Sequence, residues 1–257
     1  MTMLTGSERM RMEGKKTIVT GASRGLGRAI ALAFAREGAD VLVNCANREE
    51  QAKEVAAAIE GCVRRAVVHR ADVSDSAQAQ AMVGAALAAF GRVDVLVNNA
   101  GITMPKGPLE ISEAEWDRVM AVNLKSVFLC SRAVAEGMKA QGGGRIINIA
   151  STAGQTGTLS GPAYCAAKAG VIGLTKSLAR SFAPHNVLVN ALSPALIDTE
   201  ILYWRTPEQW RETLASIPLK RLGSPDDLAE AAVFLASSGG NFITGATLDI
   251  NGGLYMG

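Results

Sequence analysis

The chain turns through Thr20-Gly21-Ala22-Ser23-Arg24-Gly25-Leu26-Gly27, which separates a short apolar, β-branched run from an alanine-rich stretch of helical period. Glycine is needed where a chain turns sharply and where backbone must approach a pyrophosphate closely. Free N–H groups and the positive end of the helix dipole then face the anion. The place of this turn, between a first strand and a first helix, predicts a dinucleotide-binding site. A glycine-rich turn without a ligand is the alternative.

The same alternation of strand-like and helix-like runs continues along the chain. Apolar runs without strict polar alternation are typical of strands that are buried on both faces, as in a parallel sheet. We expect strands near 17–19, 41–43, 66–68, 93–97, 146–149, 187–190 and 247–250, and helices near 25–37, 48–60, 76–90, 113–140, 162–183 and 225–237. This order predicts an α/β protein of Rossmann type, with a doubly wound parallel sheet of about seven strands flanked by helices.

The domain organisation is expected to be simple. Residues 1–13 are polar and are predicted to form a flexible tail, and residues 14–257 a single Rossmann-fold catalytic domain. Two segments break the alternation, the Gly/Ser/Thr-rich stretch 151–161 and the long excursion 194–225. Both follow strands, and ligands of open parallel sheets bind beyond the carboxyl ends of strands. We expect the excursion to be a substrate lid with a short helix near 207–217.

Composition excludes several classes of protein. The chain has 257 residues, of which 48% are hydrophobic and 19% charged, and a formal net charge of +2. It is too apolar for a disordered chain and too evenly charged for a large nucleic-acid footprint. No apolar run approaches the ~20 residues of a membrane span, and the N-terminus lacks the apolar core of a secretory signal. We therefore expect a cytoplasmic protein with neither a nucleic-acid nor a membrane partner.

Cysteine and histidine usage predicts that the protein has no metal site. The four cysteines are scattered without a C-x-x-C pair, and the chain has only two histidines. Structural zinc needs closely spaced cysteine and histidine ligands. We expect reduced thiols in or near the core instead. They are Cys45, Cys62, Cys130 and Cys165.

Further motifs follow the glycine-rich turn in a fixed order. Asn98-Asn99-Ala100-Gly101 ends the fourth expected strand, Asn123 lies in the next helix, Ser151 ends the fifth strand, and Tyr164-x-x-x-Lys168 follows. A lone Tyr-x-x-x-Lys pair is weak evidence. Together with the G-x-x-x-G-x-G spacing of the turn, the set resembles the short-chain dehydrogenase/reductase family from about Lys16 to the end of the chain. The resemblance implies an oxidoreductase that acts on CH–OH and C=O groups with a nicotinamide cofactor.

The expected chemistry centres on Tyr164 and Lys168, which project from the same face of one helix. A phenol has a pKa of about 10, and a nearby ammonium or cationic nicotinamide should lower it. Tyr164 can then act as the acid in carbonyl reduction and as the base in alcohol oxidation. Ser151 can donate a hydrogen bond to the same oxygen. By the resemblance, Lys168 also holds the cofactor ribose, and Asn123 positions a water for a proton relay.

The resemblance implies further cofactor contacts. Asp72 and Val73 would face the adenine. Asn99, Ala100 and Gly101 would place backbone beside the adenosine ribose. Ile197 and Thr199, after Pro194, would contact the nicotinamide amide and the pyrophosphate. Ala195 stands where the family usually has glycine. The expected cofactor-binding residues are Gly21, Ser23, Arg24, Gly25, Leu26, Gly27, Asn47, Arg48, Asp72, Val73, Asn99, Ala100, Gly101, Tyr164, Lys168, Pro194, Ile197 and Thr199.

The end of the second strand favours NADP(H) over NAD(H). A ribose with free hydroxyls calls for a carboxylate there, but Cys45 stands at that position and the first acid is Glu49. A 2′-phosphate calls for cationic partners instead. Arg24 and Arg48 are well placed, and Asn47 could add a hydrogen bond. The alternative is that both arginines are solvated surface charges.

The C-terminal part is similar to the 3-oxoacyl-[acyl-carrier-protein] reductase subgroup, over residues 217–223, 242–245 and 251–256. This implies a 3-oxoacyl thioester substrate in fatty acid synthesis and an acyl carrier protein as a partner. The docking arginines of the subgroup correspond to Gly142 and His185 here, with Lys139, Arg145 and Arg180 nearby. Two alternatives stay open, a dehydrogenase of a small ketone, sugar or secondary alcohol and a non-catalytic dinucleotide-binding protein. Candidate pocket walls are Gln155, Thr156, Leu159, Tyr203 and Trp204.

A homotetramer is also expected. The helices predicted at 113–140 and 162–183 are unusually apolar for helices that pack one face on a sheet. The resemblance implies that they form a four-helix contact between subunits. It also implies a second interface at Leu254-Tyr255-Met256.

Overall fold

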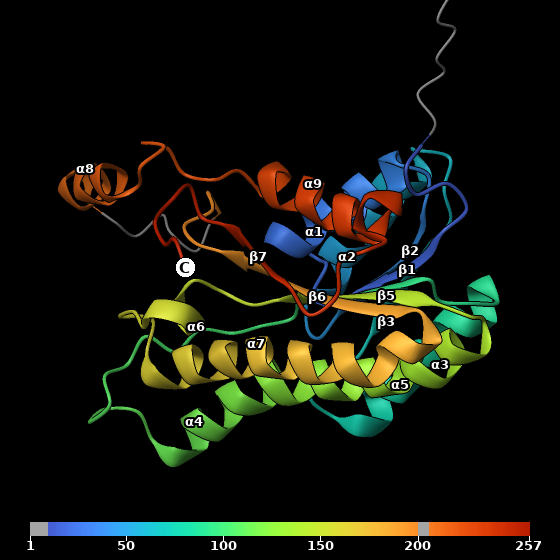
Figure 1. Ribbon diagram of the computed structural model, residues 1–257, viewed down its shortest axis with the longest axis horizontal. Coiled ribbons are helices and arrows are strands. Elements are labelled where there is room, and N and C mark those ends of the chain that lie inside the picture. Colours follow the sequence, from blue (N-terminus) through green and yellow to red (C-terminus); the bar gives the residue numbers. More distant parts are fainter. Residues whose placement is uncertain (1–9, 200–205) are drawn as a thin grey trace, which may run out of the picture.

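The computed structural model describes residues 10–199 and 206–257. Its centre is a parallel sheet with the strand order β3-β2-β1-β4-β5-β6-β7 (Figure 1). The chain moves outward from β1 in one direction and then crosses to β4 on the other side, which opens a crevice at the carboxyl edge. The strands are β1 (Lys16–Val19), β2 (Asp40–Cys45), β3 (Ala66–Arg70), β4 (Val95–Asn98), β5 (Gly144–Ile149), β6 (Val187–Pro194) and β7 (Thr247–Ile250).

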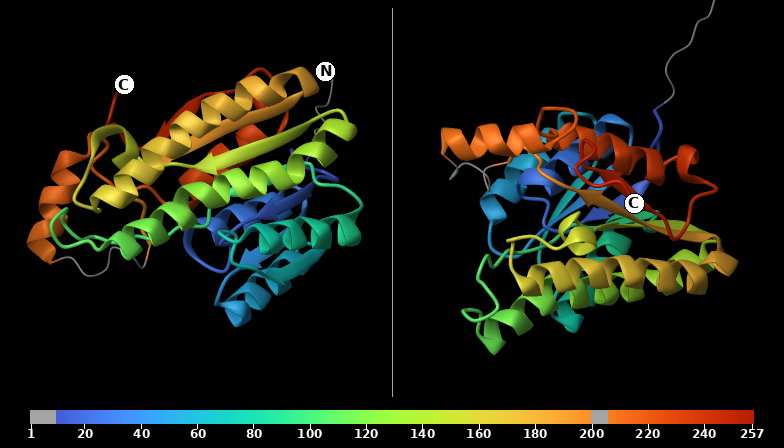
Figure 2. Two further views of the ribbon diagram at one scale, coloured as in Figure 1. Left: turned by 90° about the horizontal axis from the view of Figure 1, so that it is seen from below. Right: turned by 60° about the vertical axis from the view of Figure 1, so that its left-hand side comes forward.

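Helices cover both faces of the sheet (Figures 1 and 2). One face carries α1 (Gly25–Arg36), α2 (Glu49–Glu60) and α9 (Pro225–Ala236). On the other face, α3 (Ser76–Phe90), α5 (Ser126–Ala140) and α7 (Pro162–Phe182) lie side by side. Each layer has its own apolar core, around Phe34 and Ile59 on the first face and around Met82 and Met138 on the second. The predicted fold class is confirmed.

Strand burial explains the unbroken apolar runs in the sequence. All six residues of β2 are buried because helices cover both of its faces. The edge strands β3 and β7 are only partly buried. The sheet therefore needs apolar side chains on both sides of its central strands, as expected for a parallel sheet.

Two expected elements differ in detail. The helix predicted at 113–140 is divided into α4 (Glu113–Met120), a π-helical turn η1 (Ala121–Lys125) and α5. The Gly/Ser/Thr-rich stretch after β5 contains one helical turn, α6 (Ala153–Thr156). In the excursion after β6, α8 (Pro207–Ser216) lies at the same end of the molecule as α6 (Figure 1).

The folded body begins at an earlier residue than the sequence predicts. Met12 is fully buried in the α1 layer. Arg11 donates hydrogen bonds to Glu37, which directly follows α1, and to Glu230 on α9. Residues 10–13 therefore belong to the folded body, and the rest of the expected tail lies outside the described residues.

Within residues 10–199 and 206–257, none of the helices has the length and apolarity to cross a bilayer. No three His, Cys, Asp or Glu side chains gather there in a way that could hold a metal ion.

Candidate active site

Ser151, Tyr164 and Lys168 come together at the carboxyl edge of the sheet. Ser151 follows β5, and the other two side chains project from α7. Ser151 lies beside the Tyr164 phenol, and its hydroxyl favours the ionised form of that phenol. Ser151 Oγ also accepts the Ala153 N–H at 3.1 Å, at the start of α6. The first turn of α6 therefore holds the serine hydroxyl beside the phenol.

Lys168 lies behind this pair and is only 4% exposed. Its Nζ donates to the Ile149 carbonyl at 2.5 Å and lies 5.8 Å from the centre of the Tyr164 ring. Burial lowers the pKa of Lys168 to about 8. An ammonium out of water loses hydration, and one carbonyl replaces it only in part.

Burial also raises the pKa of Tyr164, although the Ser151 hydrogen bond opposes the rise. The expectation that the lysine lowers this pKa is therefore wrong for the protein by itself. Desolvation disfavours the phenolate and the ammonium alike. In this state Tyr164 is a neutral phenol and can donate a proton.

Asn123 lies at the centre of η1 and is fully buried. Its Nδ2 donates to the Ile102 carbonyl at 2.7 Å, and its Oδ1 accepts the Ile102 N–H at 2.8 Å. Single π-turns inside α-helices occur often at functional sites. Here the side-chain amide fixes the segment after β4 against the helix, and a water relay through Asn123 stays a prediction.

The glycine-rich turn and the end of β4 form one hydrogen-bonded unit. Thr20 Oγ1 accepts the N–H groups of Asn99 and Ala100 at 2.9 and 3.0 Å. Asn99 Nδ2 donates to the carbonyls of Thr20 and Gly21 at 2.9 and 3.1 Å. These contacts bring the predicted residues of the turn and of the β4 end to one place.

The turn fits a pyrophosphate. α1 begins without a side-chain cap among the described residues and has no acidic residue in its first turn. At Gly25, with φ +53°, an added Cβ would have no described heavy atom within 4 Å. The first N–H groups of α1 and the open space beside them are what an anion at a helix N-terminus needs.

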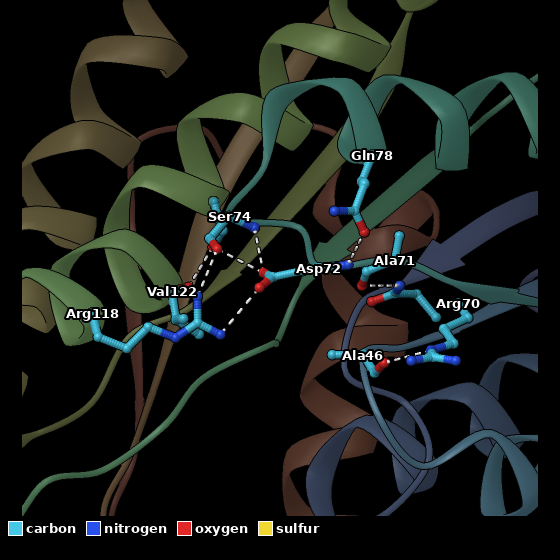
Figure 3. Close-up of polar contacts among 10 residues, drawn as sticks. Ala46, Arg70, Ala71, Asp72, Ser74, Gln78, Arg118 and Val122 are labelled. Atoms are coloured by element: carbon cyan, nitrogen blue, oxygen red, sulfur yellow. Dashed lines mark hydrogen bonds and ion pairs between the residues drawn. The ribbon is translucent and has the colours of Figure 1, made fainter.

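At the predicted adenosine end, the structure shows partners that the sequence did not indicate. Asp72 accepts hydrogen bonds from Ser74 Oγ at 2.6 Å and from Arg118 Nη2 at 3.1 Å (Figure 3). Burial would raise the pKa of Asp72, but the hydrogen bonds from Ser74 and Arg118 outweigh it and lower the pKa. Val73 is buried beside it. Arg118 lies on α4, 46 residues away, so no local pattern could have indicated this contact.

The end of β2 has the character that the sequence predicts. Cys45 is buried, and burial raises the pKa of its thiol. The segment that follows, Ala46–Arg48, is exposed. Arg24 in the glycine-rich turn is exposed as well. The sequence motifs do not indicate Arg70, which lies at the end of β3 and donates from Nε to the Ala46 carbonyl at 3.1 Å (Figure 3). The only sequence feature that could have indicated this contact is the expected parallel pairing of β2 with β3.

At the predicted substrate end, hydrogen bonds join α6 and the segment before it to the end of β6. Ser193 Oγ donates to Gln155 Oε1 at 2.7 Å, and Thr152 Oγ1 donates to the Pro194 carbonyl at 3.2 Å. Ile197 is buried and pairs with Gly223 in an isolated bridge. Among the other predicted residues, Thr199 Oγ1 lies 3.4 Å from the Ile197 carbonyl, Thr156 lies in α6, and Leu159 is exposed. Tyr203 and Trp204 lie outside the described residues.

The expected carrier-docking positions lie at the opposite edge. Gly142 precedes β5 and His185 precedes β6, whereas Ser151 follows β5. Asn186 Nδ2 donates to the Gly142 carbonyl at 3.1 Å. Arg145 starts near this edge and donates to Asn241 Oδ1 at 2.7 Å. These positions are therefore separated by the length of a strand from the predicted catalytic residues.

Known proteins match this chain over almost its whole length. A family model described as enoyl-(acyl carrier protein) reductase matches residues 21–255. The 3-oxoacyl-[acyl-carrier-protein] reductase FabG of Staphylococcus aureus (strain Mu50) is 43% identical over 242 residues, 94% of this chain and 98% of that protein. The FabG protein of Vibrio cholerae is 42% identical over 247 residues, 96% of this chain and 100% of that protein.

Two further matches widen the comparison. Nodulation protein G of Azospirillum brasilense is 43% identical over 243 residues, 95% of this chain and 99% of that protein. A crystal structure of a candidate short-chain alcohol dehydrogenase from Sinorhizobium meliloti 1021 superposes with a TM-score of 0.91 at 36% identity, over 96% of this chain and 98% of that one.

Proposed function

Since the chain belongs to the short-chain dehydrogenase/reductase family and is an oxidoreductase of CH–OH and C=O groups, we propose that it reduces 3-oxoacyl thioesters with NADPH. The proposed role is that of a 3-oxoacyl-[acyl-carrier-protein] reductase in fatty acid synthesis. The names of the S. aureus and V. cholerae relatives support this substrate class. The observation that carries the chemistry is the placement of Ser151 beside the phenol of Tyr164, with the buried Lys168 behind it.

The acid–base roles follow from this arrangement. When bound, the nicotinamide supplies the hydride that reduces the carbonyl carbon. The carbonyl oxygen gains negative charge, and the Tyr164 hydroxyl donates its proton to that oxygen. The Ser151 hydroxyl donates a hydrogen bond to the same oxygen and fixes its position. Lys168, beside the phenol, stabilises the phenolate that remains, and Asn123 completes the proton path to solvent.

NADP(H) is the proposed cofactor because the end of β2 offers cations and no carboxylate. Arg24, Arg48 and Asn47 would hold the 2′-phosphate, and the backbone of the glycine-rich turn would hold the pyrophosphate. Charge-assisted hydrogen bonds are shorter and stronger than neutral ones. Replacing both arginines by alanine should weaken NADPH binding by at least about tenfold and leave NADH binding nearly unchanged.

A reciprocal substitution tests the same proposal. Cys45 is buried, so a carboxylate there would disturb the core. Ala46 is exposed at the same strand end. Ala46→Asp should weaken NADPH binding, because the new carboxylate repels a phosphate, and should improve NADH binding through the ribose hydroxyls. Equal dissociation constants of NADPH and NADH for the unmodified protein would refute the cofactor proposal.

The substrate class is tested by comparing acetoacetyl-CoA with a panel of small ketones and sugars. NADPH consumption should be fastest, as kcat/KM, with the thioester. A faster reaction with a free ketone or sugar would instead favour the dehydrogenase alternative, to which the S. meliloti relative points. The Tyr164→Phe variant, which lacks the proposed proton donor, gives the background rate of NADPH consumption.

The proposal includes the partner and the compartment. An acyl carrier protein would present the thioester, and Lys139, Arg145 and Arg180 are the expected cationic contacts near the docking positions. The enzyme would work in the cytoplasm. All four cysteines are free thiols, which is typical of a reducing compartment.

A further inference from the structure

Arg70 occupies a place in the cofactor crevice that neither the motifs nor the comparisons assign. It is the last residue of β3 and lies opposite Cys45 in the parallel register with β2. Its Nε donates to the Ala46 carbonyl at 3.1 Å, and the Ala71 N–H donates to the Cys45 carbonyl at 2.9 Å (Figure 3). The guanidinium is therefore attached to the backbone from which the exposed segment Ala46–Arg48 begins.

The charge of this guanidinium is not neutralised by an ion pair within the described part of the chain. Arg70 is exposed, and the only hydrogen bond of its side chain to the described residues uses Nε, which leaves both Nη groups available. Two acids that follow the ends of β3 and β2 are engaged elsewhere. Asp72 is held by Ser74 and Arg118, and Glu49 pairs with Lys53 at 3.3 Å.

We propose that Arg70 binds the 2′-phosphate of NADP(H), together with Arg24 and Arg48, and so contributes to the preference over NADH. This inference rests on the proposed NADPH dependence. The planar fork of a guanidinium matches phosphate oxygens, and its two Nη groups can donate side by side. The bond to Ala46 holds the fork at the strand end before the ligand arrives, which reduces the entropy lost on binding.

The test measures binding of 2′,5′-ADP and 5′-ADP by calorimetry, without any substrate. Arg70→Gln removes the charge and keeps an N–H donor that can reach the Ala46 carbonyl. We expect it to weaken 2′,5′-ADP binding by about tenfold or more and to leave 5′-ADP binding within about twofold. Arg65→Gln is the matched control, because it removes the same charge just before the other end of β3. It should change neither affinity.

Three results would overturn the inference, and they are distinguishable. If the unmodified protein binds 2′,5′-ADP no better than 5′-ADP, the NADPH proposal fails and the role of Arg70 fails with it. If it discriminates and Arg70→Gln discriminates equally well, NADPH dependence stands and Arg70 has no part in it. If Arg70→Gln weakens both ligands equally, Arg70 only supports the backbone.

Discussion

At the scale of single residues, burial acts in opposite directions on the two titratable groups of the site. It raises the pKa of Tyr164 and lowers that of Lys168 to about 8. Both changes favour the neutral form, because a buried charge loses its hydration. A neutral phenol suits the reductive direction, in which the tyrosine must donate a proton.

Tyr164→Phe should abolish turnover and leave cofactor binding intact. The phenol is the proposed proton donor, whereas the cofactor phosphates would be held by the backbone near Gly25. Loss of one general acid costs about 10²–10⁴-fold in rate. Steady-state kinetics and NADPH titration measure the two effects. Tyr255→Phe, near the C-terminus, is the control and should keep its activity. A Tyr164→Phe rate within about threefold of the unmodified enzyme would contradict the assignment.

Lys168 should make stability depend on pH in a defined window. Its folded pKa of about 8 lies below the ordinary 10.5, so the unfolded chain binds more protons between these values. The free energy of unfolding should therefore rise with pH from 8 to 10.5, relative to Lys168→Met, by about 3 kcal/mol. Below pH 8 the full burial penalty applies.

Urea unfolding at several pH values measures this difference. Lys176→Met removes an exposed lysine from the same helix and serves as the control. A pH trend of equal size in both variants would show that the buried position of Lys168 is not its cause.

At the scale of elements, the glycine-rich turn depends on close packing between α1 and the end of β4. A Cβ on Gly27 would collide with the Asn99 side chain and lie 2.5 Å from the Gly21 carbonyl oxygen. Both neighbours are held in place, since Asn99 is bonded to Thr20 and Gly21. Glycine at this position is therefore a packing requirement as well as a feature of the motif.

Gly27→Ala should lower the free energy of unfolding by about 1–3 kcal/mol through overpacking and should weaken NADPH binding. Gly84→Ala is the matched control, because Gly84 lies in helix α3 and an added Cβ would meet no described heavy atom within 4 Å. That change should stabilise the protein by about 0.5–1 kcal/mol. Denaturant titration compares the two. Equal effects at both positions would disprove the packing argument.

At the scale of the whole molecule, large apolar side chains are exposed at several places, and two of these surfaces are the expected subunit contacts. Phe128 on α5 is 41% exposed on the helical layer that α7 shares. Phe234 on α9, Leu248 on the edge strand β7 and Met256 near the C-terminus are exposed elsewhere. An open sheet edge with apolar neighbours is a common site of association. Two such surfaces on one chain favour a tetramer with two kinds of interface.

Light scattering should give the mass of four 26.8-kDa chains. Phe128→Arg should break the α5–α7 interface and yield dimers, because a charge would be buried between subunits. Leu87→Arg is the matched control, since Leu87 is also 41% exposed but lies on α3. It should leave the mass unchanged. A stable ~27-kDa monomer at micromolar concentration would refute the tetramer.

The sequence by itself determined the features that depend on local pattern. Apolar runs and helical periods lie in contiguous residues, so they indicated the strands, the main helices and the confirmed fold class. The turn at Gly21–Gly27 and the pair Tyr164 and Lys168 are equally local, because their spacing alone puts them on one turn or one helix face. Their roles in binding and catalysis stay predictions.

Only the tertiary structure decided what depends on residues far apart in the chain. Arg118 reaches Asp72 across 46 residues, and Arg70 reaches Ala46 across 24. The direction of the pKa change at Tyr164 was also decided there. Sequence spacing places a lysine beside the phenol, but the charge of that lysine competes with desolvation by everything packed around the site. The burial of the phenol decides which of the two effects is larger, and burial cannot be inferred from a short stretch of sequence.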